Sequence, residues 1–267
     1  MQLDVSYKET WLHKINPSVK LLFMVLLFLS LLFIHNLNFM INYTAVTMIL
    51  LLVFTGHPLK RILLITLPFL FIAASTSTSM IFFGQGDTTW VKWGLLHITE
   101  ESFFRGVHLG LRAFVFAILG VLFALTTRPV YLFYSLMQQL KLKPKYAYSF
   151  MAGIRLIPIM IEEFQTIRYA MKVRGVEGKK GIGAFYYKLK SYSIPLLSQS
   201  IRRAHRIAVA MEAKRFSMVN GRTFYYKVSI SRYDAFFILY FVLFLTLAFY
   251  ISKEFPYIPI TDVRYEG

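Results

Sequence analysis

The fold is decided by residues 19–54, which read VKLLFMVLLFLSLLFI over 19–34, HNLN over 35–38 and FMINYTAVTMILLLVF over 39–54. A helix that crosses a bilayer needs about 20 mostly apolar residues, because every backbone amide must be hydrogen-bonded within the segment across roughly 30 Å of hydrocarbon. The two apolar runs approach that length, and the residues between them leave room only for a tight turn. This stretch predicts a hairpin of two membrane-spanning helices.

Three further apolar stretches predict additional spans, at residues 62–83, 103–125 and 235–251. The composition agrees, because 57% of the 267 residues are hydrophobic and only 16% are charged, which is too little polar surface for a water-soluble globule. We expect an all-α, polytopic protein of the cell membrane with about five transmembrane helices. Residues 1–127 would form an N-terminal membrane region with four spans, and residues 233–267 the last span and an external tail.

The basic residues are distributed unevenly, and this predicts the orientation of the chain. Lys and Arg number 30 against 13 Asp and Glu, and 20 of the 30 lie between residues 128 and 232. Cytoplasmic segments of membrane proteins carry such an excess, so we expect a cytoplasmic N-terminus, an external C-terminus and an external loop at residues 84–101. Some cations would meet phosphates of the lipid bilayer, and no nucleic-acid partner is expected.

Residues 128–232 are too many for a simple loop and are expected to form a cytosolic region of long amphipathic helices. Apolar side chains recur at spacings of three and four, which predicts helices at residues 131–140, 145–173 and 187–216. Pro158 and Pro195 lie inside the two longer helices as candidate bends. The glycine-rich residues 175–183 indicate a flexible linker and not a phosphate-binding loop, since the spacing and the Ser or Thr of a Walker motif are absent.

The two long helices are expected to finish alike, each with a basic residue on or beside its apolar stripe. The ends read Val173-Arg174-Gly175 and Ala213-Lys214-Arg215. Cations in the last turn of a helix stabilise its dipole by about 0.3 to 1 kcal/mol, and this ordinary role is one interpretation. The other is that each helix lies in a groove of a cytosolic partner, with its cation reaching an acidic pocket.

Several motifs resemble those of the transmembrane T components of energy-coupling factor (ECF) transporters, the EcfT/CbiQ-like family. The stretch WLHKINPSVK at residues 11–20 is similar to the family's N-terminal motif, which leads into the first span. Further along, Arg155 and Pro158 are followed by the Glu162-Glu163 pair, and the order and spacing match the family. The resemblance covers nearly the whole chain.

The resemblance is most specific at the two helix ends, which are similar to the Ala-Arg-Gly motifs that close the family's paired coupling helices. It implies that these ends dock on two cytosolic ATP-binding-cassette (ABC) ATPase subunits and transmit ATP-driven movement to a separate substrate-binding membrane subunit, the S subunit. The cargo would be a vitamin, a vitamin precursor or a metal ion. The resemblance also implies that this chain hydrolyses nothing and holds no cofactor.

The second helix end departs from the family's motif and leaves two candidates for its docking cation. Alignment of the motif puts Lys214 in the place of the arginine, whereas the apolar stripe points to Arg215, one residue on and about 100° further round the helix. We favour Arg215, because a bidentate contact with a carboxylate requires a guanidinium.

The remaining candidates favour a scaffold over an enzyme. Arg112, in the fourth predicted span, is a cation inside the bilayer, and we expect a structural or partner-facing role for it. The six histidines show no ligand-like pair, so no metal site is expected, and no set of nucleophile and base suggests catalysis. The alternative function is a self-sufficient permease with its own substrate site, against which stand the few spans and the lack of broken-helix repeats.

Overall fold

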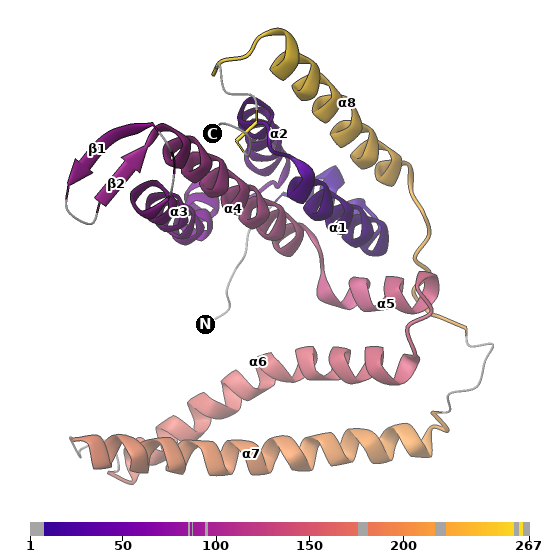
Figure 1. Ribbon diagram of the computed structural model, residues 1–267. Helices are drawn as coiled ribbons and strands as arrows, with labels where there is room; N and C mark the ends of the chain where they lie inside the picture. Colours follow the sequence, from indigo (N-terminus) through magenta and orange to yellow (C-terminus); the bar gives the residue numbers. More distant parts are fainter. Residues whose placement is uncertain are drawn as a thin grey trace. The chain divides into compact units, whose positions relative to one another are not determined.

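The computed structural model describes residues 8–84, 86, 88–93, 96–175, 181–216, 223–258 and 262–263. They form two compact units, one made of the chain up to Ser135 together with the part from Val228 onward, and one made of Leu136 to Lys227. The second unit holds α6 (Pro144–Val173) and α7 (Ile182–Ala213), and α5 (Pro129–Gln139) runs across the boundary (Figure 1). The first unit holds η1 (Trp11–Lys14), α1 (Pro17–Phe33), α2 (Leu37–Phe54), α3 (Leu59–Phe83), β1 (Thr89–Trp93), β2 (Leu96–Thr99), α4 (Glu100–Thr126) and α8 (Arg232–Glu254).

Among the described residues of the first unit, four helices are long and apolar enough to cross a membrane, namely α2, α3, α4 and α8. The helix α1 has 17 residues, which is at the short end of the range for a spanning helix, about 17 to 25. The described part of the chain is predominantly helical, so the expected all-α, polytopic membrane architecture is confirmed.

Every predicted span starts two or three residues earlier than its apolar run suggests. For α1, α2, α4 and α8 the reason is capping, because a polar residue ahead of the apolar run accepts a hydrogen bond from a backbone N–H of the first turn, whereas α3 begins directly after Pro58 without a side-chain cap. Asn16 accepts from the Ser18 amide at 3.1 Å, and Asn36 accepts from the Phe39 amide at 3.0 Å. Hydropathy alone therefore places the apolar middle of each helix and misses its first turn.

The stretch at residues 84–101, expected to be a loop, contains an antiparallel hairpin in which β1 pairs with β2. Val91 lies opposite Ile98 in the register, and the ring of Trp90 lies 5.7 Å from that of Phe103 in α4. The strands have five and four residues, too few for alternation to stand out against a mixed loop. The loop prediction was wrong on this point.

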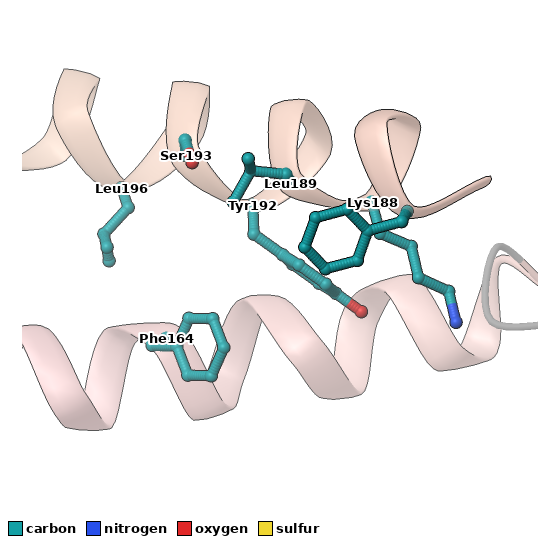
Figure 2. Close-up of a pocket in the computed structure, with 7 residues that line it drawn as sticks. Phe164, Lys188, Leu189, Tyr192, Ser193 and Leu196 are labelled. Atoms are coloured by element: carbon teal, nitrogen blue, oxygen red, sulfur yellow. The ribbon is translucent and has the colours of Figure 1, made fainter. Parts of the chain in front are cut away.

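In the second unit, α6 and α7 pack against each other through aromatic side chains. The rings of Phe164 and Tyr192 lie 5.6 Å apart, and Figure 2 shows Phe164 of α6 pointing toward Tyr192 and Leu196 of α7. Both helices continue through their internal prolines, Pro158 and Pro195, and α6 changes direction along its course (Figure 1). The prediction for α7, residues 187–216, was wrong at both ends, because the helix begins at Ile182 and ends at Ala213.

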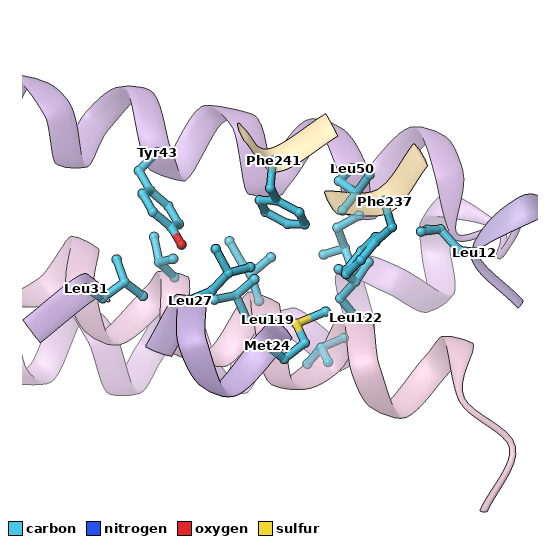
Figure 3. Close-up of a cluster of buried hydrophobic side chains, with 14 of the residues drawn as sticks. Leu12, Met24, Leu27, Leu31, Tyr43, Leu50, Leu119, Leu122, Phe237 and Phe241 are labelled. Atoms are coloured by element: carbon cyan, nitrogen blue, oxygen red, sulfur yellow. The ribbon is translucent and has the colours of Figure 1, made fainter. Parts of the chain in front are cut away.

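The core of the first unit lies where α1, α2, α4 and α8 meet. Figure 3 shows side chains from these helices converging, among them Leu27, Tyr43, Leu119 and Phe241. The outward faces of the helices also carry large apolar side chains. Leu64 of α3, for example, is 74% exposed. An exposed apolar face is unfavourable in water but suits contact with lipid, as expected for membrane spans.

The helices α3 and α4 approach closely because α4 carries glycine where its surface meets α3. A Cβ atom placed on Gly106 would lie 2.8 Å from the backbone oxygen of Ser77 and 2.5 Å from Cγ1 of Ile81. One turn further, a Cβ on Gly110 would lie 2.8 Å from the Ser77 Cβ. Small residues at such contacts let the backbones of membrane helices come together.

Candidate functional site

The end of α6 is closed by Arg174 and Gly175. Arg174 is the C-cap residue, with φ −78° and ψ 2°, and its N–H donates to the carbonyl of Ala170 at 3.2 Å. Gly175 follows with φ +72° and donates to the carbonyl of Lys172 at 3.1 Å. Glycine is favoured there, since only a residue without Cβ enters the left-handed region without steric cost.

The end of α7 has the same backbone path with different residues. Lys214 is the C-cap, with φ −82° and ψ 13°, and Arg215 follows with φ +52°. The Arg215 amide donates to the Glu212 carbonyl at 2.8 Å, and the Phe216 amide donates to the Met211 carbonyl at 2.9 Å. This pair of bonds is a Schellman motif, which satisfies the last carbonyls of the helix.

The backbone correspondence pairs Lys214 with Arg174 and Arg215 with Gly175. Arg215 would lie on the apolar stripe only if the helix continued through it, but α7 ends at Ala213 and the chain turns into a left-handed conformation at Arg215. A position cannot be projected along a helix that has already ended. The structure therefore removes the geometric basis for preferring Arg215.

Both ends are exposed, as are the apolar stripes that lead to them. Val173 is 89% exposed, and Ile161 of α6 and Ile201 of α7 are 54% and 67% exposed. Within the described residues, neither Arg174 nor Lys214 forms an ion pair. The two cations therefore stand at exposed helix ends, each beside an apolar surface that these residues do not cover.

The predicted residues Arg155, Glu162 and Glu163 of α6 do not gather around the helix ends. Arg155 and Glu162 are exposed on the helix, whereas Glu163 is partly buried and forms an ion pair with Arg203 of α7. The sequence gives no signal for Arg203 as a partner, because the pair exists only through the crossing of two helices that are separate in sequence. Glu163 and Arg203 thus join α6 to α7.

Exchange of these two charges should reveal how strongly the pair joins the helices. Glu163→Arg alone and Arg203→Glu alone place like charges at the crossing and should each lower the unfolding temperature in detergent. The double exchange should restore most of the loss, with a coupling energy of about 1 kcal/mol for a partly exposed pair. Arg202→Glu, at the exposed neighbouring position, is the control. Strictly additive effects of the two single changes would show that the pair contributes nothing.

A small cavity opens beside the crossing of α6 and α7. It has a volume of about 290 Å³, and Phe164, Tyr192 and Leu196 contribute to its mainly apolar lining (Figure 2). Lys188 of α7 also lines the cavity. Such a cavity suits an apolar side chain and offers few polar groups to orient a substrate.

Arg112 in α4 has a structural contact within the first unit. Its Nη2 donates to the backbone carbonyl of Ile34 at 2.6 Å, and Ile34 is the C-cap residue of α1. Carbonyls at the end of a helix lack a donor from the helix itself. The guanidinium therefore links the end of α1 to α4.

Comparison with known proteins places the chain in a family. The family described as Cobalt transport protein, CbiQ, matches residues 8–226. The chain belongs to the CbiQ family. The matched range includes the N-terminal motif, the helices α1 to α4 and both helix ends described above.

Individual relatives of this CbiQ-family chain carry transporter names. It is 29% identical over 236 residues to the energy-coupling factor transporter transmembrane protein EcfT of Ruminiclostridium cellulolyticum, with 84% of this chain and 86% of the relative covered. It is 30% identical over 224 residues to EcfT of Listeria innocua, with 80% and 84% covered. The resemblance to ECF T components is therefore confirmed over most of the chain.

Proposed function

We propose that this chain is the transmembrane coupling subunit of an ECF-type ABC importer. The ends of α6 and α7 would dock on two cytosolic ATPase subunits, and the membrane region would hold a separate S subunit that binds a vitamin, a vitamin precursor or a metal ion. The chain itself would catalyse nothing. The observation that carries the proposal is the matched pair of exposed cations, Arg174 and Lys214, at equivalent positions of two long helices.

The two helix ends carry cations that can bind carboxylates of a partner. The guanidinium of Arg174 presents two parallel N–H donors to a carboxylate, and the ammonium of Lys214 offers a single charged contact. The exposed stripes containing Ile161 and Ile201 would be covered when each helix lies in a groove. Two equivalent ends suit a partner with two equivalent grooves, as a pair of ATPase subunits would provide. We assign the second docking role to Lys214, because its backbone position matches that of Arg174.

The proposal fixes the orientation of the chain in the cell membrane. The second unit must face the ATPases, and it carries most of the basic residues of the chain, as cytoplasmic segments do. The N-terminus would then be cytoplasmic and the C-terminus external.

Reconstitution in lipid vesicles tests the proposal. We expect ATP-driven uptake only when this chain, two ATPases and an S subunit are present together, and none when the ATPases are replaced by variants that cannot hydrolyse ATP. Uptake by this chain alone would contradict the proposal and would support the self-sufficient permease.

A further inference from the structure

The N-terminal motif at residues 11–20 builds a buried polar junction in the first unit. It brings together the start of α1, the end of α4, the middle of α5 and the start of α8. The polar members of the junction are almost inaccessible, with exposed fractions of 3% or less; they are Asn16, Ser18, Lys20, Thr126, Ser135 and Asp234. Buried polar groups are stable only when they are hydrogen-bonded.

One part of the junction ties α1 to α5. The Ser135 hydroxyl of α5 lies 2.6 Å from Oδ1 of Asn16 and 2.5 Å from the hydroxyl of Ser18. It also accepts from the backbone N–H of Ser18 at 3.1 Å. Asn16 and Ser18 stand at the start of α1, so this single hydroxyl joins a side chain of α5 to the first turn of a predicted span.

A second part ties α1 to α8. One carboxylate oxygen of Asp234 accepts from the Asn16 backbone N–H at 2.7 Å, and the other accepts from the Ser231 N–H at 2.7 Å. The side-chain amide of Asn16 donates to the Ser229 carbonyl at 3.2 Å. Asn16 therefore bonds to α1, α5 and the segment that opens α8 at the same time.

A third part ties α1 to α4 and η1. The ammonium of Lys20, one helical turn after Asn16, donates to the Leu12 carbonyl at 2.8 Å and to the Thr126 hydroxyl at 2.6 Å. Thr126 is the last residue of α4. Beside this contact, burial lowers the pKa of His13, and the Lys20 charge acts in the same direction.

The position of Ser135 along the chain gives this junction its significance. Ser135 is the last residue of the first unit before Leu136 opens the second, and α5 passes through this boundary without interruption. After α5, the chain turns at Lys141, where φ is +55°, and enters α6. The second unit is joined to the first through α5 at one end and through the segment after α7 at the other. A movement of α6 that is transmitted through the first of these connections therefore acts on α5.

We propose that the junction of Asn16, Ser18, Ser135 and Asp234 holds α5 fixed on the ends of α1 and α8 throughout the transport cycle, as the anchor against which the coupling helices move. This inference rests on the proposed function. Opening the junction would break the hydrogen bonds of several buried polar groups at once. Because these groups are buried, water cannot replace the lost partners. Between α5 and α6, the chain then bends at the turn that contains Lys141.

A reversible cross-link tests whether the junction stays closed. The chain contains no cysteine, so Ser18→Cys with Ser135→Cys introduces the only two thiols of this chain, at positions whose hydroxyl oxygens lie 2.5 Å apart; the wild-type complex, oxidised in the same way, is the control for thiols of the partners. We expect the oxidised complex with ATPases and S subunit to take up substrate within about twofold of the reduced complex. Uptake that disappears on oxidation and returns with reductant would show that the junction opens, and the proposal would be wrong.

A second variant tests whether the closed junction is needed. Ser135→Ala should retain both ATPases but lower uptake per hydrolysed ATP, because losing one or two buried hydrogen bonds shifts the ratio of closed to open junction by about 5- to 30-fold. Ser149→Ala, which removes a hydroxyl bonded to the Lys145 carbonyl of its own helix, is the control. Unchanged coupling in Ser135→Ala would overturn the proposal. A wild-type chain that fails to retain ATPases would contradict the proposed function instead, so the two failures are distinguishable.

Discussion

Alanine at both Arg174 and Lys214 is expected to release both ATPase subunits when the complex is purified from cells that produce all its components. Loss of one partner of a desolvated charge pair in an interface costs about 2 to 5 kcal/mol, so each single change should weaken binding by more than about tenfold. Arg174→Ala should have the larger effect, because its guanidinium can bind a carboxylate through two bonds and an ammonium cannot. The measurement is the amount of each ATPase that co-purifies.

The controls separate the docking ends from the general positive charge of the helices. Arg202→Ala with Arg206→Ala removes two exposed cations from the body of α7 and should leave both ATPases bound. Arg215→Ala should be close to wild type. Loss of binding in Arg215→Ala with none in Lys214→Ala would reinstate Arg215 as the docking cation, and retention of both ATPases in Arg174→Ala with Lys214→Ala would refute docking at these ends.

Gly106→Ala is expected to destabilise the first unit, although alanine is the better helix former. The added Cβ would lie 2.8 Å from the Ser77 carbonyl oxygen, which belongs to the backbone of α3 and cannot move without shifting that helix. Overpacking of this kind costs about 1 to 3 kcal/mol. The measurement is the free energy of unfolding of the purified chain in detergent, or its unfolding temperature.

A glycine on the same helix supplies the matched control. A Cβ on Gly120 would meet nothing within 4 Å apart from its own helix and immediate neighbours, so Gly120→Ala should be neutral or stabilising by up to about 1 kcal/mol. The two substitutions are chemically identical and should differ in sign. Equal shifts in stability would mean that α3 and α4 are not held together by the close approach at Gly106.

Hydropathy predicts the membrane helices well because one physical requirement, internal satisfaction of the backbone across an apolar layer, governs the whole length of each span. Hydropathy does not detect the N-cap residues, since Asn16 and Asn36 are polar and precede the apolar runs of α1 and α2. The hairpin at β1 and β2 was missed for a different reason. Its stability depends on cross-strand neighbours and on packing against α4, and neither is visible in four or five residues.

The candidate site was predictable in location but not in detail. The motif at residues 173–175 and its counterpart at 213–215 were identified from the sequence, whereas the assignment at the second end depended on where α7 stops. Glycine after an apolar stripe indicates a helix end, but a lysine followed by an arginine does not, because neither residue favours the left-handed conformation that Arg215 adopts. The pairing of Glu163 with Arg203 could not be foreseen either, since it arises from the crossing of two helices.

The left-handed conformation of Arg215 makes the two helix ends mechanically unequal. A residue with a Cβ atom held at positive φ costs about 1 kcal/mol relative to glycine, so the turn that closes α7 is the weaker of the two, while Gly175 closes α6 without that cost. When a partner pulls equally on both helix ends, the last turn of α7 should unfold before that of α6. The ends of α7 and α6 would then unfold in a fixed order, even when the partner that binds them is symmetric.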